Sequence, residues 1–174
     1  RKAIHEDPGN ADLLFSYGNA LLSESKYDSA VEYFNSALMI DPEHDDARYY
    51  KAFALYYLKE YGQSRNELEK IVEINPAFDD GNLLMGDNYY AEKNYDSAIE
   101  WYETAYSNGV RSSDLCHVMA YIYDVRNNAE KAIPLYQETL YYDSTRTDIY
   151  TRLAELVPAE AASYIALGNR FRQQ

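Results

Sequence analysis

The chain has 174 residues, a formal net charge of −13 and a hydrophobic content of 47%. This negative charge argues against nucleic acid or an anionic membrane surface as the main partner, because both would repel it. A single cysteine, Cys116, excludes an intrachain disulfide framework and any paired-cysteine metal or redox motif. No run approaches the roughly 18–20 apolar residues of a membrane span, so direct membrane insertion is not expected.

The sequence repeats itself with a period of about 34 residues. Small residues keep this spacing at Gly18, Ala52, Gly86, Ala120 and Ala154. A second series of small residues consists of Ala30, Ser64, Ala98 and Ala132. An acidic series, which suits the first turn of a helix, consists of Asp12, Asp46, Asp80, Asp114 and Asp148. Repetition at this period is typical of a helical solenoid, so we expect one all-α repeat domain over residues 1–174.

Residues 1–8 share the phase of later repeat ends. Ala3 and Pro8 stand one period before Ala37 and Pro42, so we expect residues 1–8 to be the tail of a truncated preceding repeat. Any targeting segment upstream of this repeat would then be missing from the sequence. We expect a soluble protein, and the sequence leaves the cytoplasm and the periplasm open.

The first complete repeat, residues 11–44, contains two amphipathic segments. A helix is predicted over Ala11–Ser23, with apolar residues at helical spacing. Gly18 inside it costs about 1 kcal/mol relative to Ala, so we expect the backbone of a neighbouring helix to approach closely there. A second helix is predicted from near Asp28, as its N-cap, to Ile40, where Asp41-Pro42 ends it.

Residues 45–78, 79–112 and 113–146 repeat this pattern. Asn75-Pro76 and Asn108-Gly109 end two of these repeats. Tyr27, Tyr61 and Tyr95 recur just before the second helices, where we expect them to pack between helices.

The final stretch, residues 147–174, is irregular because Pro158 interrupts its first helix. Ala166 is in phase with Ala132, which would make Ala159–Phe171 a second helix, and we favour this register. In the alternative, Leu167-Gly168-Asn169 echoes Tyr17-Gly18-Asn19 and begins a shortened new repeat.

These residues resemble the tetratricopeptide repeat family, whose signature is a helix–turn–helix unit of about 34 residues with small packing residues, interposed aromatics and a terminal proline. The resemblance covers nearly the whole chain. It departs from the pattern at Val110 and Ser144, which replace proline, and at Thr139, which replaces a small residue. It implies an α-α superhelix, a right-handed solenoid of antiparallel helix pairs, whose first helices line a concave groove for a partner's peptide or helix.

Residues offset from the packed face of each first helix should line this groove. The candidates are Phe15, Asn19, Tyr49, Phe53, Tyr56, Tyr57, Asp87, Tyr90, His117, Tyr121 and Asp124. This set is aromatic and acidic and has no Lys or Arg, so it favours a partner segment with basic and apolar side chains. Packing between neighbouring repeats is the alternative role of the aromatic members.

One subclass of the family consists of co-chaperones that hold the C-terminal carboxylate of heat-shock proteins through Lys, Asn and Arg. Asn19 matches one of these positions, but Phe15 replaces the first lysine and Leu84 replaces the arginine. Binding of a chaperone tail is therefore not expected.

The sequence offers no chemistry typical of an enzyme. It contains no Gly-rich phosphate loop, GxSxG or HExxH motif, and His117 has no second metal ligand at helical spacing. We therefore expect no catalytic residue, no cofactor and no metal site, and a non-enzymatic protein–protein interaction module. The alternatives are a scaffold that self-associates through its terminal helices, or a regulatory region of a larger protein.

Overall fold

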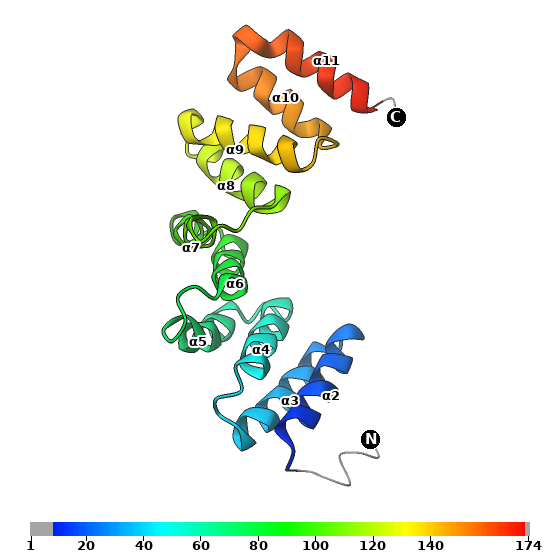
Figure 1. Cartoon of the computed structure of the whole chain (residues 1–174), viewed down its shortest axis with the longest axis vertical. Helices are drawn as coiled ribbons and strands as arrows, with labels where there is room; N and C mark the ends of the chain where they lie inside the picture. The colour runs from blue at the N-terminus through cyan, green and yellow to red at the C-terminus, as the bar shows by residue number, and fades with distance from the viewer. Residues whose placement is uncertain (1–8, 173–174) are drawn as a thin grey trace. The chain divides into compact units, whose positions relative to one another are not determined.

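The computed structural model describes residues 9–172. Within this range the chain forms ten α-helices, one short 3-10 helix and no strand (Figure 1). It divides into two compact units, Arg1–Ala105 and Tyr106–Gln174. The first unit contains α2 (Ala11–Ser23), α3 (Tyr27–Ile40), α4 (Asp45–Tyr57), α5 (Tyr61–Val72), α6 (Asp79–Ala91) and α7 (Tyr95–Ser107) up to Ala105. The second contains α8 (Ser113–Val125), α9 (Ala129–Tyr142), α10 (Thr147–Leu156), η1 (Pro158–Glu160) and α11 (Ala161–Arg172).

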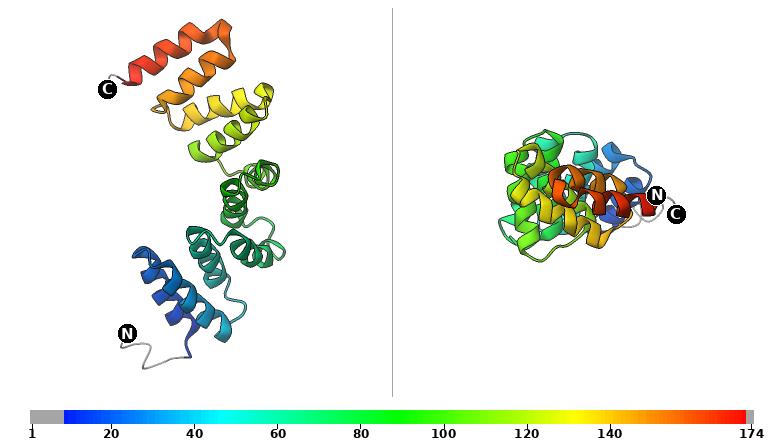
Figure 2. Two further views of the ribbon diagram at one scale, coloured as in Figure 1. Left: turned by 180° about the vertical axis from the view of Figure 1, so that it is seen from behind. Right: turned by 90° about the horizontal axis from the view of Figure 1, so that it is seen from above.

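Consecutive helices pack as antiparallel pairs, which confirms the expected all-α helical solenoid. Figures 1 and 2 show α2 beside α3 in the first unit and α10 beside α11 in the second. In the first unit α4 also contacts both α2 and α6, so the first helices of successive pairs lie next to each other. Each of the five predicted repeat ranges encloses one helix pair. The single continuous domain stays a prediction, and residues 1–8 lie outside the described residues. None of the helices in residues 9–172 is long and apolar enough to cross a membrane.

Four turns join the first and second helices of the pairs in the same way. Each has a non-glycine residue with positive φ, at Ser25 (57°), Lys59 (63°), Lys93 (61°) and Asn127 (57°). The residue after each of these donates its N–H to a carbonyl five positions back, as Glu60 does to Leu55 at 2.9 Å. This is the Schellman pattern of a helix C-terminus, in which a left-handed residue closes the helix.

The small residues on the first helices accommodate aromatic rings. A Cβ added to Gly18 would lie 2.4 Å from the ring of Phe34, and one added to Gly86 would lie 2.5 Å from the ring of Tyr102. The expectation of a close backbone approach at Gly18 was therefore wrong, because a ring of the second helix fills the space that glycine leaves.

Two boundaries differ from the sequence prediction. Asp28 is not the N-cap of its helix: the N-cap of α3 is Lys26, two residues earlier, and Asp28 lies in the first turn. In the last pair, the second helix is α11, which follows the 3-10 turn at Pro158–Glu160 and packs on α10. Its buried small residue is Gly168 against Tyr150, whereas Ala166 is exposed. The favoured pairing of the helices is thus correct, but the small contact residue is not Ala166.

Buried polar contacts tie the helices of the first unit together. Ser64 on α5 is fully buried and donates to the carbonyl of Ala52 on α4 at 2.8 Å. Asn88 on α6 donates to Ser64 Oγ at 3.0 Å. Because these groups are buried, losing one partner would leave the others unsatisfied. The chain of contacts therefore fixes how α4, α5 and α6 face one another.

Candidate functional site

The first unit has a cavity of about 360 Å³ on the face of its first helices, which we call the unit 1 cavity. Its lining residues are Asn19, Leu22, Ser23, Tyr27, Tyr50, Phe53 and Tyr57. Three of them, Asn19, Phe53 and Tyr57, were predicted from the sequence. Leu22 near the end of α2 shares their offset from the packed face, and three residues were missed: Ser23 on α2, Tyr27 at the start of α3, and Tyr50 on α4.

Stacked rings form one wall of the unit 1 cavity. Tyr27 and Tyr57 lie with ring centroids 4.9 Å apart and planes inclined by 8°. Phe53 lies 4.9 Å from Tyr57 at 58°. Tyr57 is nevertheless 48% exposed, so the stack presents an open aromatic edge. Such an edge combines apolar area with a hydroxyl group, which suits a contact with another protein.

The other predicted residues of the first unit lie elsewhere. Phe15 is half-buried, and its ring packs against Phe34, His44 and Tyr50 at the hydrophobic core. Tyr49 meets Phe78 edge to face at 5.3 Å.

Tyr56 and Tyr90 contact the tyrosines at the starts of the second helices. Tyr56 packs against Tyr61 with ring centroids 5.8 Å apart, and Tyr90 packs against Tyr95 at 5.6 Å. These contacts fit the packing role expected for the tyrosines that begin the second helices.

Asp87 lies on α6, three residues before Tyr90. Its Oδ1 accepts a hydrogen bond of 2.6 Å from the hydroxyl of Tyr102 on α7. Burial raises the pKa of the Asp87 carboxyl, and the Tyr102 hydrogen bond partly opposes this rise. Burial and the charges of Asp80 and Asp87 raise the pKa of Tyr49 to about 12. The hydroxyls of Tyr49 and Tyr102, whose pKa values are both raised, are therefore protonated at neutral pH.

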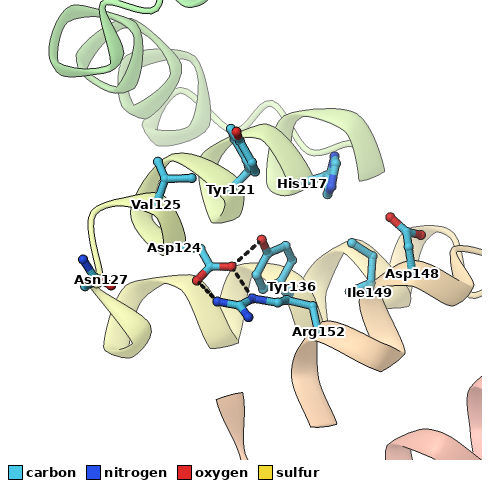
Figure 3. A pocket seen from close by; sticks show the side chains of 9 residues that line it. All are labelled: His117, Tyr121, Asp124, Val125, Asn127, Tyr136, Asp148, Ile149 and Arg152. Carbon is cyan, nitrogen blue, oxygen red and sulfur yellow. Dashed lines mark hydrogen bonds and ion pairs between the residues drawn. The ribbon is translucent and has the colours of Figure 1, made fainter. Parts of the chain in front are cut away.

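The second unit has a larger cavity of about 560 Å³, which we call the unit 2 cavity (Figure 3). It is lined by His117, Tyr121, Asp124, Val125, Asn127, Tyr136, Asp148, Ile149 and Arg152. The structure brings together three of the residues predicted for this unit, His117, Tyr121 and Asp124, which lie along one face of α8, whereas Asp114 does not line the cavity. Their role in binding stays a prediction.

An ion pair crosses the floor of the unit 2 cavity. Arg152 on α10 forms a bidentate pair of hydrogen bonds to Asp124 on α8. Its Nε donates to Oδ2 at 2.6 Å and its Nη2 donates to Oδ1 at 2.7 Å. The hydroxyl of Tyr136 on α9 donates to Asp124 Oδ2 at 3.0 Å. These hydrogen bonds, with Arg152 the larger influence, hold the pKa of Asp124 below its usual value. The groove candidates from the sequence include no Lys or Arg, but the lining of this cavity does include Arg152, which neutralises Asp124.

His117 at the edge of the unit 2 cavity is held neutral. Arg146 donates from Nη2 to His117 Nδ1 at 2.9 Å, so this nitrogen is an acceptor. Burial lowers the pKa of the His117 imidazole, and the charge of Arg146 lowers it further. The same Arg146 also pairs with Asp114 at 3.1 Å.

The sequence could not place Arg152, Tyr136 and Ile149 in this cavity. They come from α9 and α10, and the prediction took its candidates only from the first helices of the four complete repeats, α2, α4, α6 and α8. A signal was available in the repeat phase, because Tyr136 stands one period after Tyr102, and both tyrosines donate to an aspartate of the preceding helix.

The chemistry that these groups offer is recognition. The Cys116 thiol is buried, and its burial raises its pKa to about 11, so it is a poor nucleophile at neutral pH. Within residues 9–172, no three His, Cys, Asp or Glu side chains gather as a metal site would require. What remains are exposed rings, hydroxyls and carboxylates around two cavities.

Two family models match parts of the chain. The model for subunit 3 of the anaphase-promoting complex, or cyclosome, matches residues 1–71, and a tetratricopeptide repeat model matches residues 49–112. Among curated proteins, Hsp70-Hsp90 organizing protein 1 of Glycine max is 29% identical over 111 residues, which is 63% of this chain and 19% of that protein. The chain thus spans less than a fifth of the length of this relative.

Solved structures share the fold over most of the chain. The crystal structure of MamA protein has a TM-score of 0.82 and 15% identity, covering 94% of this chain and 92% of that one. YrrB, described as a TPR protein with an unusual peptide-binding site, has a TM-score of 0.79 and 14% identity, covering 99% of this chain and 92% of that one. At such identities the likeness shows the fold alone.

Proposed function

Because the chain belongs to the tetratricopeptide repeat family, we propose that it is a non-enzymatic interaction module that holds a peptide or helix of a partner protein against its first helices. Its relatives support protein–protein interaction as the general role. The name of the Hsp70-Hsp90 organizing protein refers to other proteins, and YrrB is described as having a peptide-binding site.

The observation that carries the proposal is the convergence of predicted groove residues on cavities. His117, Tyr121 and Asp124, chosen by phase alone, line one cavity of about 560 Å³. A cavity of this size is within the range that holds side chains of a ligand. The unit 1 cavity adds an open tyrosine edge at Tyr57. Aromatic side chains of this kind are enriched at protein interfaces.

The partner that fits is a segment with apolar and basic side chains. Apolar groups would enter the cavities against Phe53, Tyr57 and Ile149, and basic groups would meet the carboxylates at their rims. Asp148 is exposed at the unit 2 cavity, whereas Asp124 is already paired with Arg152. The attraction for a basic partner is therefore weaker in this cavity than the composition of the chain indicates.

Affinity capture from the native source extract tests the proposal. The variants are Tyr57→Ala and Tyr121→Ala, and the matched control is Tyr141→Ala on the second helix α9, whose side chain is 83% exposed. Circular dichroism first establishes that all three are helical. We expect both cavity variants to lose a retained protein that wild type and Tyr141→Ala keep. Equal retention by all variants, or recovery of the chain itself as the sole product, would contradict the proposal and favour self-association.

A further inference from the structure

Asp87 is a half-buried carboxylate without a cationic partner. Its one hydrogen bond within the described residues is the bond that Oδ1 accepts from Tyr102, and Oδ2 accepts none. Arg65 on the neighbouring α5 is already engaged, because it pairs with Glu92 at 2.6 Å and lies 4.5 Å over the ring of Tyr89. Removing a carboxylate from water without pairing it is costly, so the site favours a cation from outside.

The second unit contains a related pair of side chains with a cation in place, although its aspartate stands three residues later in the repeat than Asp87 does. There an aspartate of the first helix, Asp124, accepts a hydrogen bond from a tyrosine of the following helix, Tyr136, and a guanidinium grips both carboxylate oxygens. Tyr102 stands one repeat period before Tyr136 and likewise donates to an aspartate of the preceding first helix, Asp87. The two sites therefore share a carboxylate and a donating hydroxyl, and Asp87 lacks the guanidinium.

Several tyrosines lie near Asp87 in the first unit, and Tyr102 is hydrogen-bonded to it. Tyr90 follows it by three residues on α6, which places both side chains on one helix face. Tyr49 and Tyr56 lie two turns apart on α4, which contacts α6, and the charge of Asp87 contributes to the raised pKa of both. A guanidinium packs readily on tyrosine faces, as Arg111 does on Tyr106 at 3.5 Å in this chain.

We propose that Asp87, with Tyr56 and Tyr90 beside it, is the subsite that takes an arginine side chain of the bound partner. This rests on the proposed function, because it names one residue of the segment that the first helices hold. The guanidinium would bridge Oδ1 and Oδ2 while Tyr102 keeps its hydrogen bond, as Arg152 does beside Tyr136. Lysine is the poorer fit, because an ammonium cannot bridge both oxygens in one plane and is more strongly hydrated.

The test uses methylguanidinium as the probe and methylammonium as its matched control, each at millimolar concentration. Carboxyl carbon shifts in the NMR spectrum report binding at Asp87 and at Asp124 separately. In wild type we expect a saturable shift at Asp87, none at Asp124, and at least about tenfold weaker binding of methylammonium. Asp87→Asn keeps an acceptor for Tyr102 and should abolish binding. Arg152→Met vacates the second site, so methylguanidinium should then bind at Asp124 as well.

Several outcomes would overturn the inference. The first is that Asp87 shows no saturable shift although Asp124 shows one in Arg152→Met. The second is an unchanged affinity for methylguanidinium in Asp87→Asn, and the third is equal binding of the two probes. Capture of the partner separates this inference from the proposed function. If Tyr57→Ala and Tyr121→Ala lose the partner but Asp87→Asn retains it in full, the interaction module stands and the arginine subsite fails.

Discussion

The size of certain residues on the first helices matches the size of the side chain that faces each of them from the second helix. Gly18 faces the ring of Phe34, and Gly86 faces the ring of Tyr102. In the repeat between them the same two phases carry Ala52 and Leu68, which share one buried cluster. In these three repeats a ring goes with glycine and the smaller leucine with alanine, whereas the fourth repeat combines Ala120 with the ring of Tyr136.

We predict that Gly18→Ala destabilises the first unit by about 1–3 kcal/mol, because its Cβ would overlap the Phe34 ring by more than helix propensity returns. Phe34→Leu in the same chain should recover part of this loss, since it recreates the Ala52 and Leu68 combination. Urea unfolding followed by Trp101 fluorescence measures both. Gly62→Ala is the control: nothing lies within 4 Å of its added Cβ, so it should stabilise by about 1 kcal/mol. A neutral Gly18→Ala would show that the ring moves aside freely.

A second residue whose environment sets its charge is His117. Burial and Arg146 lower its pKa in the folded chain, so the folded state disfavours its protonated form. The unfolded chain protonates near pH 6.5, and stability therefore falls as the pH decreases through this value, until the folded pKa is passed. Asp114 and Asp148 act in the opposite direction on the same group.

We predict that His117→Gln, which keeps an acceptor for Arg146, reduces the loss of stability between about pH 7.5 and about pH 5.5 by up to about 1 kcal/mol. Urea unfolding at several pH values, followed through amides of α8, gives the comparison. Identical pH profiles for wild type and the variant would mean that His117 titrates equally in the folded and unfolded chain.

At the scale of elements, the helix pairs are closed by turns that impose a left-handed residue. Ser25, Lys59, Lys93 and Asn127 occupy this position, and none is glycine. An L side chain in this conformation costs roughly 1–2 kcal/mol, of which glycine avoids most. The turns therefore store a small strain at each helix end.

We predict that Lys59→Gly and Lys93→Gly each stabilise the first unit by about 1 kcal/mol, with Lys59→Ala close to neutral. Thermal unfolding of the three variants checks this. The same stability for the alanine and glycine variants would show that the left-handed conformation carries no cost here.

The helices could be predicted from the sequence because their apolar spacing, small residues and Asp-Pro stops keep one repeat phase. The left-handed turns could not, since Ser, Lys and Asn carry no signal as strong as glycine. Asp28 was misjudged as an N-cap because its type suits both the cap and the first turn. Phase also predicted Ala166 as the small contact, but the turn at Pro158–Glu160 shifts the last helix and buries Gly168 instead.

At the scale of the molecule, phase predicted three lining residues of each cavity but little of the electrostatics of either. His117, Tyr121 and Asp124 share a cavity as their spacing indicated. Arg152 on α10 reaches the same cavity and contacts Asp124, which lies 28 residues earlier in the sequence. Spacing along a single helix cannot predict such a contact. For the same reason the sequence could not show that Asp124 is paired with an arginine and Asp87 is not.

Site-specific photo-crosslinking tests the central claim, that partners bind on the first helices. A benzophenone side chain replaces Tyr57 or Tyr121 on that face, and Ile74 or Tyr141, which are 80% and 83% exposed, as controls beyond it. After capture from the source extract and irradiation, we predict a covalent adduct with the same partner from positions 57 and 121 and none from 74 and 141. Adducts formed from 74 or 141 instead, or adducts of twice the chain's own mass, would contradict the account.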